Sequence, residues 1–152
     1  MAYDQAQAEF EEGYRLYEST QGDAYTFLAL SGLGFSTCCR GDLEQSRRHF
    51  VELLTEGLRR KDFLWLLYAL PGLALYLARS GEVERAAAVW AQALCHPFVA
   101  NAQYYEDVVG RVVAEATADL PPDMLAAARE NGRSLDIWGM SELLLAELSR
   151  HS

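Results

Sequence analysis

The sequence lacks an even set of cysteines and an apolar segment at its start. Its three cysteines, Cys38, Cys39 and Cys95, form an odd set that includes two neighbours, and neighbouring cysteines seldom pair. The first residues read Met-Ala-Tyr-Asp-Gln, without the basic and apolar regions of a secretory signal. Because both features are typical of a reducing compartment, we predict a cytoplasmic protein.

β-Branched residues are also scarce, whereas alanine, leucine and glutamate dominate. This composition favours helix over strand. Hydrophobic residues make up 51% of the chain and charged residues 23%, which is ordinary for a soluble globular protein. The 152 residues suffice for one domain with its own core. We therefore predict a single all-α domain over residues 1–152.

Basic residues are outnumbered, since 13 Lys and Arg face 22 Asp and Glu, for a net charge of −9. The excess lies at both ends, with −4 in residues 1–41 and −5 in residues 101–152. An acidic surface repels phosphate backbones, so we expect no nucleic-acid partner. The one basic cluster, Arg59-Arg60-Lys61, ends an amphipathic segment, where it complements the negative end of the helix dipole.

A membrane-spanning segment is not expected either. The uncharged run from Phe63 to Ala78 has 16 residues, fewer than the roughly 20 that a bilayer requires. Such a run predicts a helix that is buried on nearly all sides. Pro71 lies within it and predicts a kink near residues 67–69, or a break there.

Patterns typical of catalysis, metal binding or cofactor binding are missing. Cys95-His96 directs two side chains apart on a helix, and no second pair occurs at the spacing of zinc ligands. His49 has no nucleophile in a strained turn beside it, and Glu11-Glu12 is typical of a solvated helix face. Gly32-Leu33-Gly34 follows no strand, as a dinucleotide loop would. We predict no enzymatic activity, no metal and no cofactor.

The clearest positive feature is a repeat of 40 residues. Two groups of positions fall in register at this offset: Ala6, Ser46 and Ala86, with Phe10, Phe50 and Trp90 and with Tyr14, Leu54 and Leu94; and Leu30, Gly32, Leu33 and Gly41 with Leu70, Gly72, Leu73 and Gly81. A period of this length is the signature of stacked supersecondary units, none of which buries its apolar face alone. Such arrays usually bind or scaffold other proteins.

Turn signals divide the first part of the chain at steps of 19, 20 and 20 residues. They are Gly22-Asp23, Gly41-Asp42, Lys61-Asp62 and Gly81-Glu82. Glycine there suits a left-handed residue after a helix, and the acidic residue suits the start of the next helix. Since apolar residues between the turns recur every three or four positions, we predict helices at about residues 3–19, 24–40, 43–60, 63–79 and 83–95.

The remaining third departs from this period. A helix is predicted at about 102–118 after His96-Pro97, a short one at about 122–131 that stops at Asn131-Gly132, and a last one at about 135–149. The helices then form pairs at about 3–40, 43–79 and 83–118, and residues 122–149 form capping helices. Terminal units of a stack are normally atypical because they cover the open end of its core.

Two helices per repeat, with small residues where they cross, resemble the tetratricopeptide repeat. The positions that carry the resemblance are Leu30, Leu33, Gly34, Gly41, Ser46 and Phe50, then Leu70, Leu73, Ala74, Gly81, Ala86, Trp90 and Ala93. The repeat here is about six residues longer than the usual 34, and Thr37 and Leu77 stand where the family has an aromatic residue. The resemblance implies a right-handed superhelix of antiparallel helix pairs.

A narrower resemblance covers about residues 25–148. Residues 80–86, 96–101 and 120–123 are similar to the C-terminal end of the repeat array in large bacterial signalling ATPases and transcriptional regulators. The resemblance implies that this chain is the terminal part of such an array. Neither a phosphate-binding loop nor a basic recognition helix of those proteins is present in it.

In tetratricopeptide repeats the first helix of each pair lines a concave groove, which places the candidate site. The positions carried over are Leu28, Ser31, Phe35, Cys38 and Cys39 from the first such helix, and Tyr68, Pro71, Leu75, Ala78 and Arg79 from the second. We single out Phe35, Tyr68 and Leu75. An apolar groove suits a protein partner: an amphipathic helix, another domain, or a second copy of the chain in a homodimer.

Two alternatives to this protein-interaction module remain at this point. The capping helices can fill the groove, which would leave a purely structural end of a repeat array without a partner. The chain can also be a small-molecule sensor with a pocket between helices, lined by Trp65, Tyr68 and Trp90.

Overall fold

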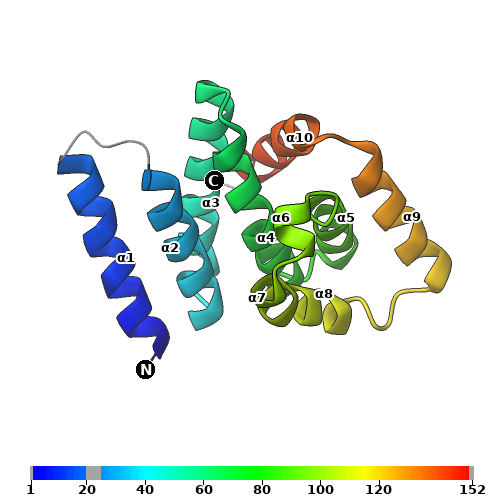
Figure 1. Ribbon diagram of the computed structural model, residues 1–152. Coiled ribbons are helices and arrows are strands. Elements are labelled where there is room, and N and C mark those ends of the chain that lie inside the picture. The colour runs from blue at the N-terminus through cyan, green and yellow to red at the C-terminus, as the bar shows by residue number, and fades with distance from the viewer. Residues whose placement is uncertain (1, 20–24, 151–152) are drawn as a thin grey trace.

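The computed structural model describes residues 2–19 and 25–150, and within these two ranges it contains helices and no strand (Figure 1). The longer helices are α1 (Ala2–Ser19), α2 (Thr26–Arg40), α3 (Leu43–Arg60), α4 (Phe63–Arg79), α5 (Val83–Ala93), α9 (Pro122–Ser134) and α10 (Ile137–Ser149). Shorter segments lie between α5 and α9: α6 (Pro97–Ala100), α7 (Gln103–Tyr105), the π-helical η2 (Glu106–Gly110) and α8 (Arg111–Ala116). The prediction of an all-α chain is confirmed.

Three of the four turns predicted from the sequence are present in the structure. Gly41 and Gly81 adopt left-handed φ angles of 86° and 87°, and Lys61 adopts 55°. Asp42 caps α3 by accepting a hydrogen bond from the Gln45 amide at 3.1 Å, which satisfies one of the donors left open at a helix start. The fourth predicted turn, Gly22-Asp23, lies outside the described residues.

Pro71 does not break its helix, so that part of the prediction is wrong. The helix α4 runs unbroken from Phe63 to Arg79, and most of its residues are buried. A proline inside a helix costs about 3 kcal/mol, but burial of apolar side chains on every side of α4 outweighs that cost. A hydrogen bond near the proline links α4 to α2: the hydroxyl of Ser31 donates to the Tyr68 carbonyl at 3.2 Å.

The short helix expected at 122–131 continues past Asn131-Gly132 to Ser134. The reason lies in the packing of α9 along α5. A Cβ atom on Gly132 would lie 1.9 Å from the backbone oxygen of Ala88. Gly132 is therefore a residue of close helix approach inside α9 and does not terminate the helix.

The predicted helix at 102–118 is present but irregular. It begins at Gln103, ends at Ala116, and contains the π-helical segment η2 between α7 and α8. The fifth helix ends at Ala93, earlier than expected, and a short helix α6 follows at Pro97. A π-helical turn widens the helix locally, and such turns are frequent at functional sites.

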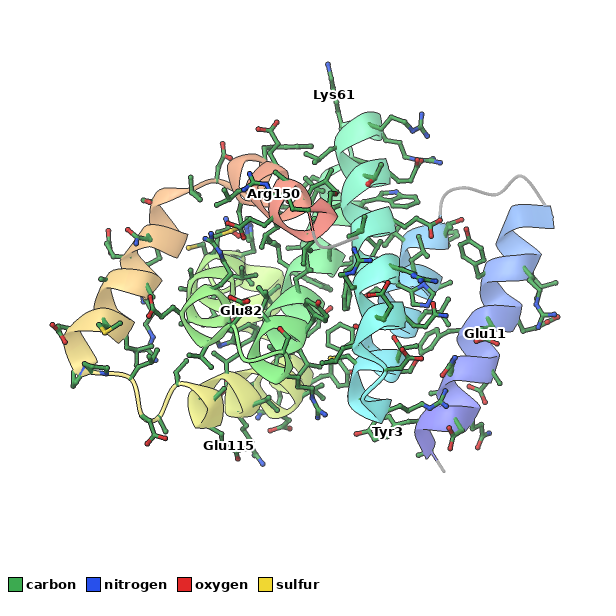
Figure 2. All side chains as sticks on the ribbon, turned by 180° about the vertical axis from the view of Figure 1, so that it is seen from behind. Tyr3, Glu11, Lys61, Glu82, Glu115 and Arg150 are labelled. Atoms are coloured by element: carbon green, nitrogen blue, oxygen red, sulfur yellow. The ribbon has the colours of Figure 1, made fainter. Side chains whose placement is uncertain are left out.

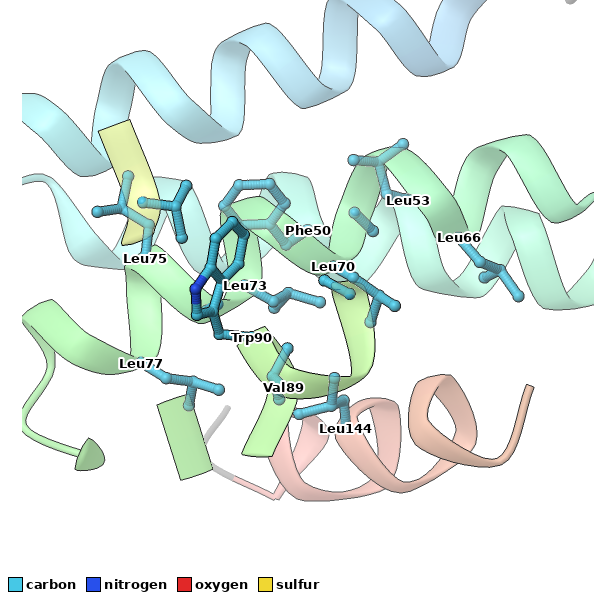
Figure 3. Close-up of a cluster of buried hydrophobic side chains, with 14 of the residues drawn as sticks. Phe50, Leu53, Leu66, Leu70, Leu73, Leu75, Leu77, Val89, Trp90 and Leu144 are labelled. Atoms are coloured by element: carbon cyan, nitrogen blue, oxygen red, sulfur yellow. The ribbon is translucent and has the colours of Figure 1, made fainter. Parts of the chain in front are cut away.

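The core gathers around α4, which contacts α2, α3, α5, α8 and α10. Phe50 of α3 lies at its centre and is fully buried (Figure 3). Its ring comes within 2.5 Å of the position that a Cβ on Gly34 would take, and within 2.2 Å of that position on Gly72. The two glycines let α2 and α4 close on the same aromatic ring.

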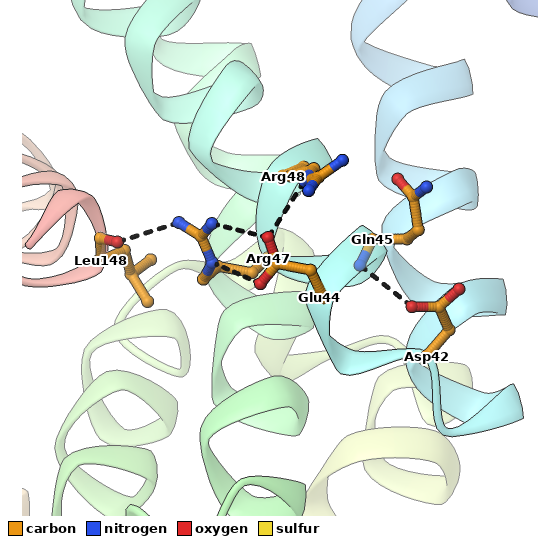
Figure 4. A network of polar contacts seen from close by, with 6 residues as sticks. All are labelled: Asp42, Glu44, Gln45, Arg47, Arg48 and Leu148. Atoms are coloured by element: carbon orange, nitrogen blue, oxygen red, sulfur yellow. Dashed lines mark hydrogen bonds and ion pairs between the residues drawn. The ribbon is translucent and has the colours of Figure 1, made fainter. Parts of the chain in front are cut away.

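The last two helices pack on the helices that precede α6 in the chain. The helix α9 packs along α5, and α10 packs against α3 and α4. Arg47, whose side chain is almost buried, fastens α10 by donating to the Leu148 carbonyl at 3.0 Å and to the Glu44 carboxylate at 2.9 Å (Figure 4). This guanidinium satisfies a carbonyl that the end of α10 would leave without a partner.

In the described ranges no helix is long and apolar enough to cross a bilayer.

Candidate binding pocket

An apolar pocket of about 440 Å³ opens where α1, α2, α4 and the α7–η2 segment meet. From α1 it receives Tyr3, Ala6 and Phe10. Six residues of α2 form its floor: Leu28, Ser31, Gly32, Phe35, Ser36 and Cys39. Tyr68 of α4 and the group Tyr104, Tyr105 and Val108 complete the wall.

The structure brings together half of the groove positions carried over from the repeat family. Leu28, Ser31, Phe35, Cys39 and Tyr68 all line this pocket. They are contributed by two helices, α2 and α4, that are far apart in sequence but contact each other. The offsets of the family therefore selected residues that do share one surface.

The other groove positions lie elsewhere. Leu75 is fully buried in the core, so its side chain does not line an exposed groove, and that expectation is wrong. Cys38, Pro71 and Ala78 are buried as well. Arg79 is exposed but is not among the pocket residues. The reason is the central position of α4, which leaves few of its side chains accessible.

The wall of the pocket is a connected set of aromatic rings. Phe35 lies 6.3 Å from Tyr105 and 6.5 Å from Tyr104, and these two tyrosines are 5.5 Å apart. Phe98 joins the set through Tyr68, at 5.3 Å, and through Tyr105, at 6.1 Å. Tilted and edge-on pairs at such distances stabilise one another and hold the wall in shape before any ligand arrives.

The sequence interpretation missed Tyr104 and Tyr105. Their signal was present, because two adjacent tyrosines follow Asn101 at the start of a predicted helix. The sequence does not show that the chain after α5 turns back and places these two tyrosines beside Phe35, which lies about 70 residues earlier.

The pocket carries no formal charge, since its described lining contains no Asp, Glu, Lys, Arg or His. Burial raises the pKa of Tyr105 to about 12 and also raises the pKa of Tyr104. The hydroxyls of Ser31 and Ser36 are occupied, because they donate to the backbone oxygens of Tyr68 and Leu33, both at 3.2 Å. The exposed wall is therefore apolar and suits uncharged, hydrophobic groups.

The helix α1 packs along α2 and makes polar contacts with α2 and α3. Arg40 of α2 pairs with Asp4 at 3.0 Å and also contacts Gln7. The Tyr14 hydroxyl donates to Glu52 of α3 at 2.9 Å. Between them, the ring of Phe10 packs on Gly32. Many other side chains of α1 project away from the neighbouring helices (Figure 2).

A pocket shared by Trp65, Tyr68 and Trp90 does not form. Trp65 is buried between Phe27, at 6.0 Å, and the guanidinium of Arg60, at 4.8 Å. Trp90 is buried in the core as well. Only Tyr68 reaches the pocket described above, so the sensor site expected from the sequence is wrong in its composition.

The capping helices do not fill the pocket. Its lining includes residues of α1, α2, α4, α7 and η2 but none from the described parts of α9 and α10. Those helices pack on α3, α4 and α5 instead. Within the described ranges, moreover, no three histidine, cysteine, aspartate or glutamate side chains are grouped so as to hold a metal ion.

No family model, curated protein or solved structure matches this chain. The class that the fold and the site define is an all-helical protein with a preformed, uncharged aromatic pocket at one end.

Proposed function

We propose that this chain is a non-catalytic protein-interaction or scaffolding module, which binds an apolar helix face of a partner in the pocket between α1, α2 and η2. One observation carries the proposal: the preformed aromatic wall has an apolar surface and no charged group. Aromatic anchors in a desolvated pocket supply most of the energy in protein interfaces. The pocket is open, and its rim includes Leu28, 37% exposed, and Tyr104, 60% exposed.

The proposal includes a tetratricopeptide-like arrangement of the helices, similar to that at the C-terminal end of bacterial regulators, and a place in the cytoplasm. It is supported by the left-handed turns after α2, α3 and α4 and by Phe50 between Gly34 and Gly72. No cofactor and no nucleic acid enter the mechanism. Binding rests on burial of apolar surface, and polar contacts at the rim set the register.

The test is a selection of displayed amphipathic helical peptides on the purified protein. Leu28→Glu places a carboxylate at the mouth of the pocket, and we expect it to weaken selected peptides roughly tenfold or more. Leu94→Glu is the matched control, because Leu94 is 39% exposed at the end of α5 and does not line the pocket. We expect this control to leave affinity unchanged.

Light scattering over a hundredfold concentration range shows whether a second copy occupies the same pocket. Self-association that Leu28→Glu abolishes would make the chain its own partner. If neither peptides nor a second copy bind, the chain is a purely structural end of an array and the proposed function is wrong. If both variants bind peptides equally well, binding does not use this pocket and the proposed site is wrong.

A further inference from the structure

The 40-residue repeat relates α1 to α3 and α2 to α4, so the surroundings of related residues can be compared. Phe50 packs on two helices, through Gly34 of α2 and Gly72 of α4. Phe10 is the counterpart of Phe50 and has the second of these contacts, since it lies 2.3 Å from the Cβ position of Gly32, the counterpart of Gly72. In the described part of the chain, no helix supplies the first contact.

The exposure of the two helices differs accordingly. Phe50 is fully buried, whereas Phe10 is 37% exposed. Leu53 of α3 is also fully buried. Gly13, its counterpart in α1, would place a Cβ atom with nothing within 4 Å. One side of α1 is therefore open, whereas the related residues of α3, Phe50 and Leu53, are fully buried.

The neighbouring side of α2 is open as well. Tyr68 of α4 packs against α2, with its ring 5.1 Å from Phe27 and its carbonyl bonded to Ser31. Its counterpart one repeat earlier is Leu28, which is 37% exposed and faces the pocket. If the interface between α2 and α4 is continued by one repeat, the next helix falls on the pocket. The open sides of α1 and α2 therefore form one continuous surface for a further helix. We call this surface the seat, and it includes Phe10, Gly13 and Leu28.

We propose that this seat receives a helix from a partner protein that completes the array. The occupant is an amphipathic, leucine-rich helix that runs parallel to α2 and sets a glycine or alanine against Phe10, as α2 sets Gly34 against Phe50. Residues 1–41 carry a net charge of −4, so lysine and arginine on the polar face of the occupant complement the charge of this part of the chain. This inference rests on the proposed function of the same pocket and names its partner.

The small residue is the most specific part of the proposal. At Gly34 and Gly72, even a Cβ atom would approach the Phe50 ring to within 2.5 Å or less. A large side chain at the matching position of the occupant would therefore hold it away from Phe10 and from Leu28. The contact with Phe10 therefore makes the seat specific for helices with a small residue at the matching position. The aromatic wall adds apolar surface that the bound helix buries.

An extended chain tests whether the seat accepts such a helix. A copy of residues 25–42 is joined directly to Tyr3, which reproduces the 40-residue spacing because Leu43 is the counterpart of Tyr3. We expect the melting temperature to rise by roughly 4 °C or more, since the added helix buries apolar surface. Phe10→Ala should lower the melting temperature at least twice as much in the extended chain as in the natural one.

The matched control is the extended chain with Gly34→Leu in the added copy only, which should lose most of the gain. A melting temperature that does not rise, or an equal effect of Phe10→Ala in both chains, would overturn the inference.

The peptide selection separates this inference from the proposed function. Selected peptides that share a small residue among leucines, and that Phe10→Ala weakens about tenfold, support both. Peptides that depend on Leu28 but not on Phe10, and that lack the small residue, support the proposed function and overturn the inference. If the extended chain is stabilised but no peptide binds, the seat accepts a helix of the same chain. The proposed role in binding a partner protein would then be wrong.

Discussion

Gly132 is the position where intrinsic helix propensity and packing make opposite predictions for the same substitution. It lies inside α9, so Gly132→Ala should gain about 1 kcal/mol from propensity alone. The new Cβ atom would, however, lie 1.9 Å from the Ala88 oxygen, and real Cβ atoms essentially never come within 3.0 Å of such a neighbour. Because that neighbour is backbone, it cannot rotate away, and α9 must move from α5 by about 1 Å.

The magnitude follows from these two terms. Overpacking of a tight contact costs about 1–3 kcal/mol, and a clash with backbone belongs at the upper end of that range. After the gain in propensity, we expect Gly132→Ala to lower the free energy of unfolding by about 1–2 kcal/mol. For a chain of this length, that corresponds to a fall in melting temperature of roughly 2–8 °C.

Thermal and urea unfolding, followed by circular dichroism at 222 nm, measure this change. Gly13→Ala is the matched control, because Gly13 is also inside a helix but its Cβ position is open. We expect it to leave stability unchanged or to raise it by up to about 1 kcal/mol. If Gly132→Ala stabilises the protein as much as Gly13→Ala does, the close approach of α9 to α5 is refuted.

Three further predictions follow from polar and thiol groups. Arg47→Met should destabilise the protein by about 1.5–3 kcal/mol and speed amide exchange at the end of α10, because it removes charge-assisted hydrogen bonds to Leu148 and Glu44; equal exchange in both proteins would contradict this role. Arg47 and Arg48 lower the pKa of Glu44 to about 2, below the ordinary value of 4.5. The resulting stabilisation is complete above pH 4.5 and is lost as the pH falls towards 2, so urea midpoints should fall over this window less steeply in Glu44→Gln than in the natural protein. Burial raises the pKa of Cys38 to about 11, so a thiol reagent at pH 8 should modify the exposed Cys95 within minutes and reach Cys38 only after unfolding; rapid modification of Cys38 in the folded protein would count against its burial.

Local chemistry explains which parts of the fold were predictable from sequence. The turns at Gly41, Lys61 and Gly81 were found because a left-handed residue followed by an acidic one leaves a signal within two positions. Gly132 was misread as a helix end, since a glycine needed for close packing and one needed for a turn look the same in sequence. Only the neighbouring α5 distinguishes the two.

The candidate site was predictable to a similar extent. The repeat offsets selected Leu28, Phe35 and Tyr68 because helix periodicity fixes which residues share a face. Leu75 failed because periodicity does not tell how many neighbours surround a helix, and α4 is surrounded on nearly all sides. Tyr104 was missed because its place beside Phe35 depends on the path of the chain after α5.

The surfaces at α5 and at α1 differ in how far other helices cover them. At the α5 end, α9 and α10 cover the core, and Arg47 and Gly132 make specific contacts that fasten them. At the α1 end, Phe10 keeps 37% of its surface exposed beside an aromatic pocket. A helix added at the α1 end would extend the existing contacts between α2 and α4, whereas one added at the α5 end would have to displace α9. The proposed partner helix therefore fits the α1 end and not the α5 end.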